Sequence, residues 1–389
     1  MIGLRSTRLS SLLLSVSLIS LFSLVHQQAW SASQSELALT DPLAFVQQWQ
    51  TDVAHSEGEI SLSQLKAKLA SYRVIHVGEI HHRYADHLVQ LALLQSLHQQ
   101  HPELAIGVEW FQQDFQPWLD AYILGRIDEA ELLHQTQYYQ RWRFDYRLLQ
   151  PIMRYAKTHQ LRVLALNAPN ELTRQVSSLG RHSLSLEQRA RMPKIHPPGE
   201  AQQQRLSAFF SDKIPPDRDI EDYIFAQRIW DETMAANAVR FLQQYPQHKL
   251  LVFAGNFHIA HQEAIPKDIA RRLPALRDQQ ITISSGGFEH YQQGRTDYYV
   301  YTDPIQLPPH GRLGAELNTE NATIEGIVAQ SAAEKAGFEL GERIIQFNQT
   351  PIRHYPDLIL ALSQTEPGQQ IELQLKSGEH TRIISVILD

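Results

Sequence analysis

The sequence contains no cysteine among its 389 residues. This absence excludes disulfides, thiolate metal sites, a cysteine nucleophile and a lipid-anchored cysteine at the start of a mature chain. No Gly-x-Ser-x-Gly nucleophile elbow, P-loop or dinucleotide fingerprint occurs either, which disfavours serine hydrolase, nucleotide phosphotransfer and NAD chemistry. The net charge of −7 is modest and gives no reason to expect a nucleic-acid partner.

Long apolar runs are also scarce, and the most prominent one lies near the start of the chain. Arg5 and Arg8 precede an apolar, serine-containing stretch at 9–25, and small residues follow it. This order of positive, apolar and small residues is typical of a secretory signal peptide. The apolar stretch is shorter than the ~20 residues that span a bilayer well. We therefore expect residues 1–33 to be a signal peptide and the mature chain to begin between Ala32 and Gln34.

Export would make the mature protein periplasmic or secreted. Association with the inner or the outer membrane stays an alternative, as does an uncleaved signal that acts as a membrane anchor.

Residues 34–301 are expected to form one domain, and from Tyr72 onward they alternate between strand-like and helix-like patterns. Helical spacing of apolar residues is clear at 84–98 and 223–244. Alternation of this kind predicts an α/β domain with a mostly parallel sheet flanked by helices. The strand-like runs lie at 74–77, 105–108, 161–166, 250–254 and 281–284, with an edge strand at 298–301.

The segment 177–222 breaks this rhythm and is rich in Gln, Arg and Pro. We interpret it as an insertion that either covers the functional site or forms a solvated surface excursion.

Two Gly-x-x-His elements, each directly after an apolar run, are the strongest functional signal. They are Gly78–His81 and Gly255–His258. Glu79 belongs to the first element, and Glu109 and Asn167 follow two other predicted strands. Because the carboxyl ends of parallel strands meet at one edge of a sheet, we expect these side chains to converge.

Imidazoles and carboxylates without thiolates suit a divalent metal such as zinc, manganese, cobalt or iron. The predicted metal ligands are Glu79, His81 and His258. A bound metal lowers the pKa of its water, and in that case Glu79 or Glu109 is the predicted catalytic base. His87 begins a helix and is a further candidate for the lining of the site.

A dense aromatic patch, 138–146, admits two interpretations. It could form a stacking wall for a flat apolar ligand, with a tyrosine oxygen as an iron ligand. It could equally be ordinary packing. Asp231 and Glu232, on a predicted helix, either reach the site or pair locally.

Five ordered motifs resemble the bacterial ChaN-like haem-binding family of the wider Tiki/TraB group, over about 72–285. They are Gly78–His81, Val108–Phe111, Ala165–Pro169, Trp230–Ala235 and Ala254–His258. The chain departs from the family's pattern in having His82 where Asp is frequent, and in lacking the lipoprotein cysteine.

The resemblance implies an α/β fold, haem or iron as the ligand, and a role in haem-iron uptake at the cell envelope. Candidate haem-binding residues are His81, His258, Tyr138, Tyr139 and Tyr146. Relatives in the Tiki branch are metal-dependent proteases with paired Gly-x-x-His motifs. A metal-dependent hydrolase or peptidase is therefore the alternative function.

Residues 302–310 contain three prolines and are expected to form an extended linker to a separate domain at 311–389. That last segment resembles a PDZ domain of the bacterial HtrA-protease type, with Gly311–Gly314 as its carboxylate-binding loop. The resemblance implies that backbone N–H groups of Leu313, Gly314 and Ala315 receive the terminal carboxylate of a partner. A domain that only packs on its neighbour, and a homodimer of the whole protein, stay open alternatives.

Overall fold

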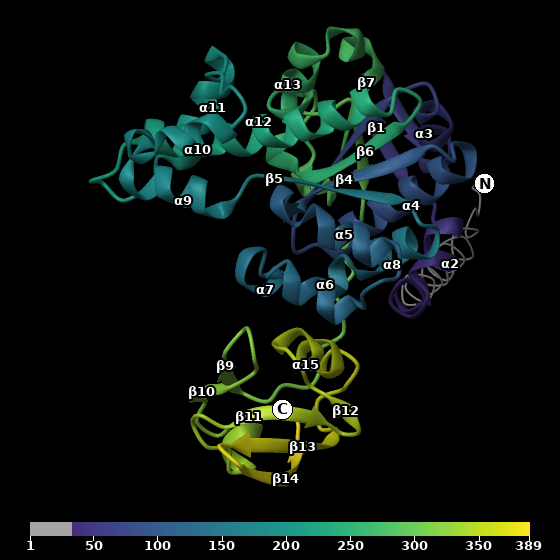
Figure 1. Ribbon diagram of the computed structural model, residues 1–389. Coiled ribbons are helices and arrows are strands. Elements are labelled where there is room, and N and C mark those ends of the chain that lie inside the picture. Colours follow the sequence, from purple (N-terminus) through teal and green to yellow (C-terminus); the bar gives the residue numbers. More distant parts are fainter. Residues whose placement is uncertain (1–32) are drawn as a thin grey trace, which may run out of the picture. The chain divides into compact units, whose positions relative to one another are not determined.

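An eight-stranded sheet organises the larger part of the computed structural model, which describes residues 33–389 (Figure 1). The strand order is β2-β1-β8-β7-β3-β6-β4-β5. All neighbours from β8 through β5 run parallel, whereas β1 pairs antiparallel with β8 and with β2. The predicted, mostly parallel sheet is therefore confirmed. Its strands are β1 Asp52–His55, β2 Gly58–Ser61, β3 Val74–Glu79, β4 Leu104–Gln112, β5 Arg162–Asn167, β6 Lys249–Gly255, β7 Gln280–Gly286 and β8 Tyr298–Tyr301.

Sequence patterns located the central strands well because those strands are buried on both faces and read as continuous apolar runs. Strand β4 is longer than expected and stays buried over all nine of its residues. Its register against β5 shifts between Val108 and Gln112, so the strand is irregular where it carries Glu109. The short hairpin β1–β2 was not predicted, because its four-residue strands are partly exposed and mostly polar.

Helices cover the two faces of the sheet. On one face, α12 (Ile220–Gln244) and α13 (Ile265–Arg272) pack on alternate residues of the strands, such as Leu250, Val252 and Ala254. The intervening residues point to the opposite face. There the helix α4 (Tyr84–Gln100) contacts β3 and β7, and its Gln90 donates to the Val77 carbonyl.

The remaining helices of this domain are shorter. The insertion at 177–222 is largely helical and joins α12. The bounds are α3 Leu62–Leu69, α5 Gln116–Ile123, α6 Glu129–Gln135, α7 Tyr138–Arg141, α8 Gln150–Thr158, α9 Asn170–Leu179, α10 Leu186–Arg191 and α11 Glu200–Phe210. Gly125, which has a φ of +71°, lies in the turn between α5 and α6.

Contacts divide the chain into residues 1–49 and residues 50–389. In the first unit, α2 (Pro42–Gln48) begins after Asp41, whose side chain accepts a hydrogen bond from the Ala44 N–H. The predicted signal peptide lies almost wholly outside the described residues. Among residues 33–389, no helix is both long and apolar enough to cross a membrane.

Residues 311–389 fold around their own apolar core, which includes Leu313, Ile344, Leu358 and Leu373. Two small antiparallel sheets, β10-β9 and β12-β11-β13-β14, enclose this core together with two helices. The elements are β9 Ala315–Leu317, β10 Ile324–Ile327, α14 Ala332–Lys335, β11 Arg343–Phe347, β12 Thr350–Pro351, α15 Tyr355–Leu362, β13 Gln370–Ser377 and β14 His380–Ile387.

Candidate functional site

The two Gly-x-x-His elements lie side by side at the carboxyl ends of β3 and β6, which are neighbouring parallel strands. Each glycine leaves room for the other element. A Cβ on Gly78 would lie 2.3 Å from Oδ1 of Asn256, and a Cβ on Gly255 would lie 2.8 Å from Cε1 of His81. The glycines are therefore required by close packing between the motifs, and the predicted convergence of the strand ends is present.

Glu79 is a buried carboxylate with three side-chain donors around it. Its Oε1 lies 2.9 Å from Nδ1 of His81 and 3.2 Å from the Trp110 indole nitrogen, and its Oε2 lies 2.8 Å from Nε2 of His87. Burial opposes its negative charge, but the charge of His87 and the bonds from both histidines hold the pKa of Glu79 below its usual range. The same carboxylate raises the pKa of His87 to about 9 against the effect of burial.

His81 is the part of this cluster that reaches an open cavity. Its side chain is 30% exposed, and its ring contacts Trp142 and Phe144 at centroid distances of 4.7 and 5.1 Å. Burial lowers the pKa of His81, but the Glu79 bond and the nearby Glu109 charge outweigh burial and raise it. Nδ1 is held by Glu79, while Nε2 has no hydrogen-bond partner among residues 33–389.

His258 occupies a different environment, enclosed by two carboxylates. Its Nδ1 lies 2.6 Å from Oδ1 of Asp231, and its Nε2 lies 3.2 Å from Oε1 of Glu109. Oε2 of Glu109 also accepts a 2.7 Å hydrogen bond from the Gly255 N–H. Burial opposes a charge on His258, yet the two carboxylates raise its pKa to about 10. His258 is therefore a buried imidazolium that ties β4, β6 and α12 together.

The two acidic residues of α12 have separate roles, which sequence reasoning left open. Asp231 reaches the site through His258, and its other oxygen accepts from Arg228 at 3.0 Å. Glu232 turns away and pairs with Arg228, Arg271 and Arg272. Glu232 thus belongs to a structural ion-pair network.

A cavity of about 530 Å³ opens over His81, Glu109 and His258. Its other walls come from segments far apart in the sequence, including the insertion and α12. Aromatic and basic side chains are prominent among them. They include Trp110, Trp142, Phe144, Phe210, Tyr223, Trp230, Arg141 and Arg174.

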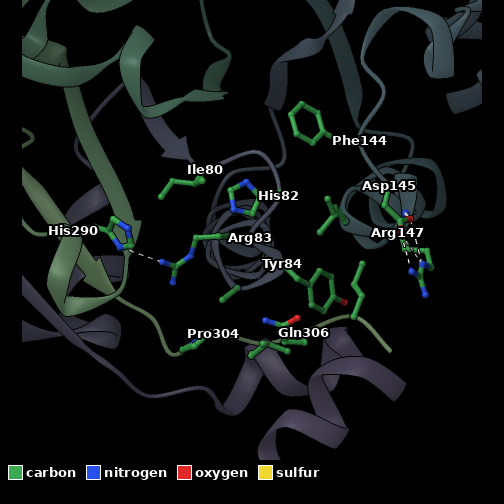
Figure 2. A pocket seen from close by; sticks show the side chains of 14 residues that line it. Ile80, His82, Arg83, Tyr84, Phe144, Asp145, Arg147, His290, Pro304 and Gln306 are labelled. Carbon is green, nitrogen blue, oxygen red and sulfur yellow. Dashed lines mark hydrogen bonds and ion pairs between the residues drawn. The ribbon is translucent and has the colours of Figure 1, made fainter. Parts of the chain in front are cut away.

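A second cavity of about 550 Å³ lies next to this one, and Phe144 lines both. Figure 2 shows His82 among its lining side chains, with Arg83 directed toward His290. Successive residues of one loop, His81 and His82, therefore line different cavities.

The predicted tyrosine candidates lie elsewhere. Tyr138 and Tyr146 are 1% exposed, and burial raises the pKa of both well above the usual value. Neither they nor Tyr139 lines the cavity of His81. Within the aromatic patch, Trp142 and Phe144 therefore form a wall of the His81 cavity, whereas the tyrosines are packing residues. A tyrosine that does line the cavity is Tyr223, which sequence reasoning missed.

The predicted metal ligands Glu79, His81 and His258 do not form a metal site. Within residues 33–389, no group of three or more His, Asp or Glu side chains is arranged to hold a metal ion. The physical reason is that the carboxylate oxygens near these histidines are already paired with imidazole nitrogens. Glu79 accepts a hydrogen bond from His81 and forms an ion pair with His87, and the two nitrogens of His258 lie 2.6 and 3.2 Å from carboxylate oxygens of Asp231 and Glu109. The prediction of a divalent metal as cofactor is therefore not supported.

Two known families match the chain. The family described as "Haem-binding uptake, Tiki superfamily, ChaN" matches residues 65–269, more than half of the chain. The chain belongs to this ChaN family. Residues 311–388 match the PDZ domain family, so the carboxyl-terminal domain is a PDZ domain, as predicted.

Several solved structures are similar to the chain. ChaN of Campylobacter jejuni in the structure titled "Cofacial heme binding" has 16% identity and a TM-score of 0.48, covering 65% of this chain and 97% of that one. A mutant of the erythromycin esterase EreC, in its open conformation, has 14% identity and a TM-score of 0.37, with 62% and 78% coverage. A serine endoprotease from Yersinia pestis has 18% identity and a TM-score of 0.19, with 20% and 28% coverage. The comparison with curated proteins found no match.

The predicted carboxylate-binding loop of the PDZ domain has a fixed backbone. The Leu313 carbonyl accepts from the Ala333 N–H at 2.7 Å, and the Gly314 carbonyl accepts from Val328 at 2.9 Å. Gly314 has a φ of +70°, and a Cβ there would lie 2.2 Å from Cβ of Ser331. Ala315 begins β9, which pairs with β10 on one side and is the edge of its two-stranded sheet.

Proposed function

We propose that the ChaN domain binds haem in the cavity above β3 and β6, with Nε2 of His81 as the iron ligand. The observation that carries this proposal is the hydrogen bond from His81 Nδ1 to Glu79, which leaves Nε2 without a partner at the cavity wall, within the described chain. A carboxylate on the second ring nitrogen fixes the orientation of a metal-binding histidine and makes the imidazole a better donor. The family's description supports haem as the ligand.

The cavity suits a flat, mostly apolar ring with acidic side groups. Its volume of about 530 Å³ lies within the range of ligand pockets. Trp142 and Phe144 supply aromatic surface for the ring, and Arg174 supplies a cationic group for a carboxylate, whereas Arg141 already pairs with Glu171 at 2.8 Å. When bound, haem would supply an iron ion that Nε2 of His81 could ligate.

His81 is a better candidate ligand than the other residues predicted from sequence. Both nitrogens of His258 lie against carboxylate oxygens, Nδ1 at 2.6 Å from Asp231 and Nε2 at 3.2 Å from Glu109, so neither is free to face a ligand in the cavity. Tyr138 and Tyr146 are buried away from the cavity, and their raised pKa values disfavour the phenolate that iron would need.

We further propose that the protein serves haem-iron uptake in the periplasm after removal of residues 1–33. The motivating features are the positive, apolar and small residues at 5–33 and the family's description as a haem-uptake family. We propose that the PDZ domain binds the carboxyl terminus of an envelope protein through Leu313, Gly314 and Ala315, with the peptide added to β9. Detection of Met1 on periplasmic protein by mass spectrometry would contradict the proposed removal of residues 1–33.

The haem proposal is tested by titrating the purified protein with haemin and following the Soret absorbance. The parent is expected to bind one equivalent, and His81→Ala to lose most of the affinity and change the spectrum. The matched control is His82→Ala, because His82 is the next residue but lines the other cavity (Figure 2). Equal haem affinity and identical spectra for the parent and His81→Ala would refute the ligand assignment.

A further arm separates the candidate ligands. Tyr223→Phe keeps the aromatic ring in the cavity and removes the phenol oxygen. We expect the Soret spectrum of this variant to match that of the parent. A changed spectrum for Tyr223→Phe with an unchanged spectrum for His81→Ala would assign the iron to tyrosine instead.

A further inference from the structure

A third cavity, of about 360 Å³, lies between α11 and the segment that follows β6. It borders the proposed haem site without opening on the same residues. Phe257 lines this cavity, whereas the next residue, His258, lines the haem cavity. Likewise, Phe209 lines this cavity and Phe210 lines the haem cavity. Asp231 lines the third cavity and bonds to His258 at 2.6 Å.

The charged groups of this cavity are paired, except one. Arg205 pairs with Glu263, and Asp231 is engaged by Arg228 and His258. Arg295 is half-buried and makes no side-chain hydrogen bond or ion pair with residues 33–389. Burial lowers its pKa, as expected for a cation that has lost water without gaining a carboxylate. An arginine left in this condition favours an anion from outside the protein.

The apolar wall of the cavity is aromatic. The rings of Phe209 and Phe257 lie 4.7 Å apart at an interplanar angle of 38°, and Leu206 continues the surface. Phe209 is 42% exposed, and Nζ of Lys213 lies 3.1 Å from its ring centroid. An apolar wall beside an unpaired guanidinium fits a ligand that has a ring at one end and an anionic group at the other.

We infer that this cavity is a binding site for a small aromatic carboxylate, held by Arg295 and by the Phe209–Phe257 wall. A carboxylate matches the planar guanidinium with two parallel hydrogen bonds, and a single ring fits the volume. The site does not depend on haem, because this cavity and the haem cavity share no lining residue.

The test uses the full chain without haem and benzoate as the probe, with ligand-observed NMR and calorimetric titration. Benzamide has the same ring without the charge, and inorganic phosphate has the charge without the ring. We expect benzoate to bind at least about tenfold more tightly than either, because both the ion pair and the aromatic wall contribute. Equal binding of benzoate and benzamide would overturn the inference.

Substitutions of cavity residues test where benzoate binds. Arg295→Gln should weaken benzoate binding about tenfold or more, and Arg295→Lys should keep part of it. The matched control is Arg126→Gln, an exposed arginine outside the cavity. Because Arg295 also borders a more polar cavity, Phe209→Ala is needed, and it too should weaken binding. Parent-like benzoate affinity in both Arg295→Gln and Phe209→Ala would refute the site.

Two further measurements exclude a merely structural role for Arg295. The thermal midpoint of Arg295→Gln should not fall, because the replaced charge has no partner within the described chain. Benzoate should also shift the imidazole resonances of His258 in the parent, since Asp231 lies between the cavity and that ring. A lowered midpoint together with unshifted His258 signals would contradict the inference.

Discussion

Replacing Glu79 with glutamine tests whether this carboxylate prepares His81 for iron. The substitution keeps the shape of the side chain, removes its charge and turns one oxygen into an amide nitrogen. That nitrogen would face a histidine nitrogen on one side, because Oε1 of Glu79 accepts from His81 at 2.9 Å and Oε2 forms an ion pair with Nε2 of His87 at 2.8 Å. At least one of the two contacts is therefore lost.

The expected magnitudes follow from these contacts. Loss of the partner of a metal-binding histidine typically costs 10–100-fold in affinity, so haem binding should weaken by about 1.4–2.8 kcal/mol. Stability should fall by as much as ~3–5 kcal/mol, because His87 loses the charge that balances it in the interior. Both effects are expected from one substitution because one carboxylate serves both rings.

The assay is a haemin titration followed by Soret absorbance, together with urea unfolding followed by circular dichroism. The control is Glu187→Gln, since that glutamate has a side chain 82% exposed and lies on α10. If Glu79→Gln unfolds earlier but binds haem within about twofold of the parent, Glu79 is structural and does not position an iron ligand.

Three further predictions address the glycine, the buried imidazolium and the domain boundary. Gly255 has a φ of −56°, which alanine adopts without backbone strain, but the methyl group of Gly255→Ala would lie 2.8 Å from Cε1 of His81, displace that ring and weaken haem binding. Gly199→Ala, at a φ of −68° and outside the haem cavity, should bind haem as the parent does in the same Soret titration. The raised pKa of His258 stabilises the fold fully below its unfolded value near 6.5, and this contribution is lost as the pH rises toward 10; the thermal midpoint should therefore fall across that range more steeply in the parent than in His258→Gln. A chain that ends at Asp303 should keep haem binding and lose binding of carboxyl-terminal peptides, and loss of haem binding would show that residues beyond Asp303 help to build the site.

The sequence predicted the strand ends that carry Glu79, His81 and His258 because buried parallel strands leave a strong local signal. The apolar run at β3, the one at β6 and the glycine that follows each run can be recognised within a segment of about ten residues. The parallel pairing of these strands then brings the motifs together, as the structure shows.

Other features had no local signal. Nothing in the sequence indicates that Glu79 bonds to His87 or that Glu109 and Asp231 enclose His258, since these pairs join separate elements. The hairpin β1–β2 was missed because its short strands are mostly polar, and Tyr223 of α12 was missed because nothing local shows that it lines the cavity. Residue types alone indicated metal ligands that the geometry of residues 33–389 does not support, because carboxylates that neutralise histidines look the same in sequence as carboxylates that bind a metal.

The most direct test of the central claim is pulsed EPR on the ferric haem complex of protein labelled with ¹⁵N-histidine. We expect a magnetic coupling between iron and a labelled imidazole nitrogen that is present in the parent and in His82→Ala and absent in His81→Ala. A complex with no labelled-histidine coupling, or with the same coupling after His81→Ala, would contradict the assignment of His81 as the iron ligand.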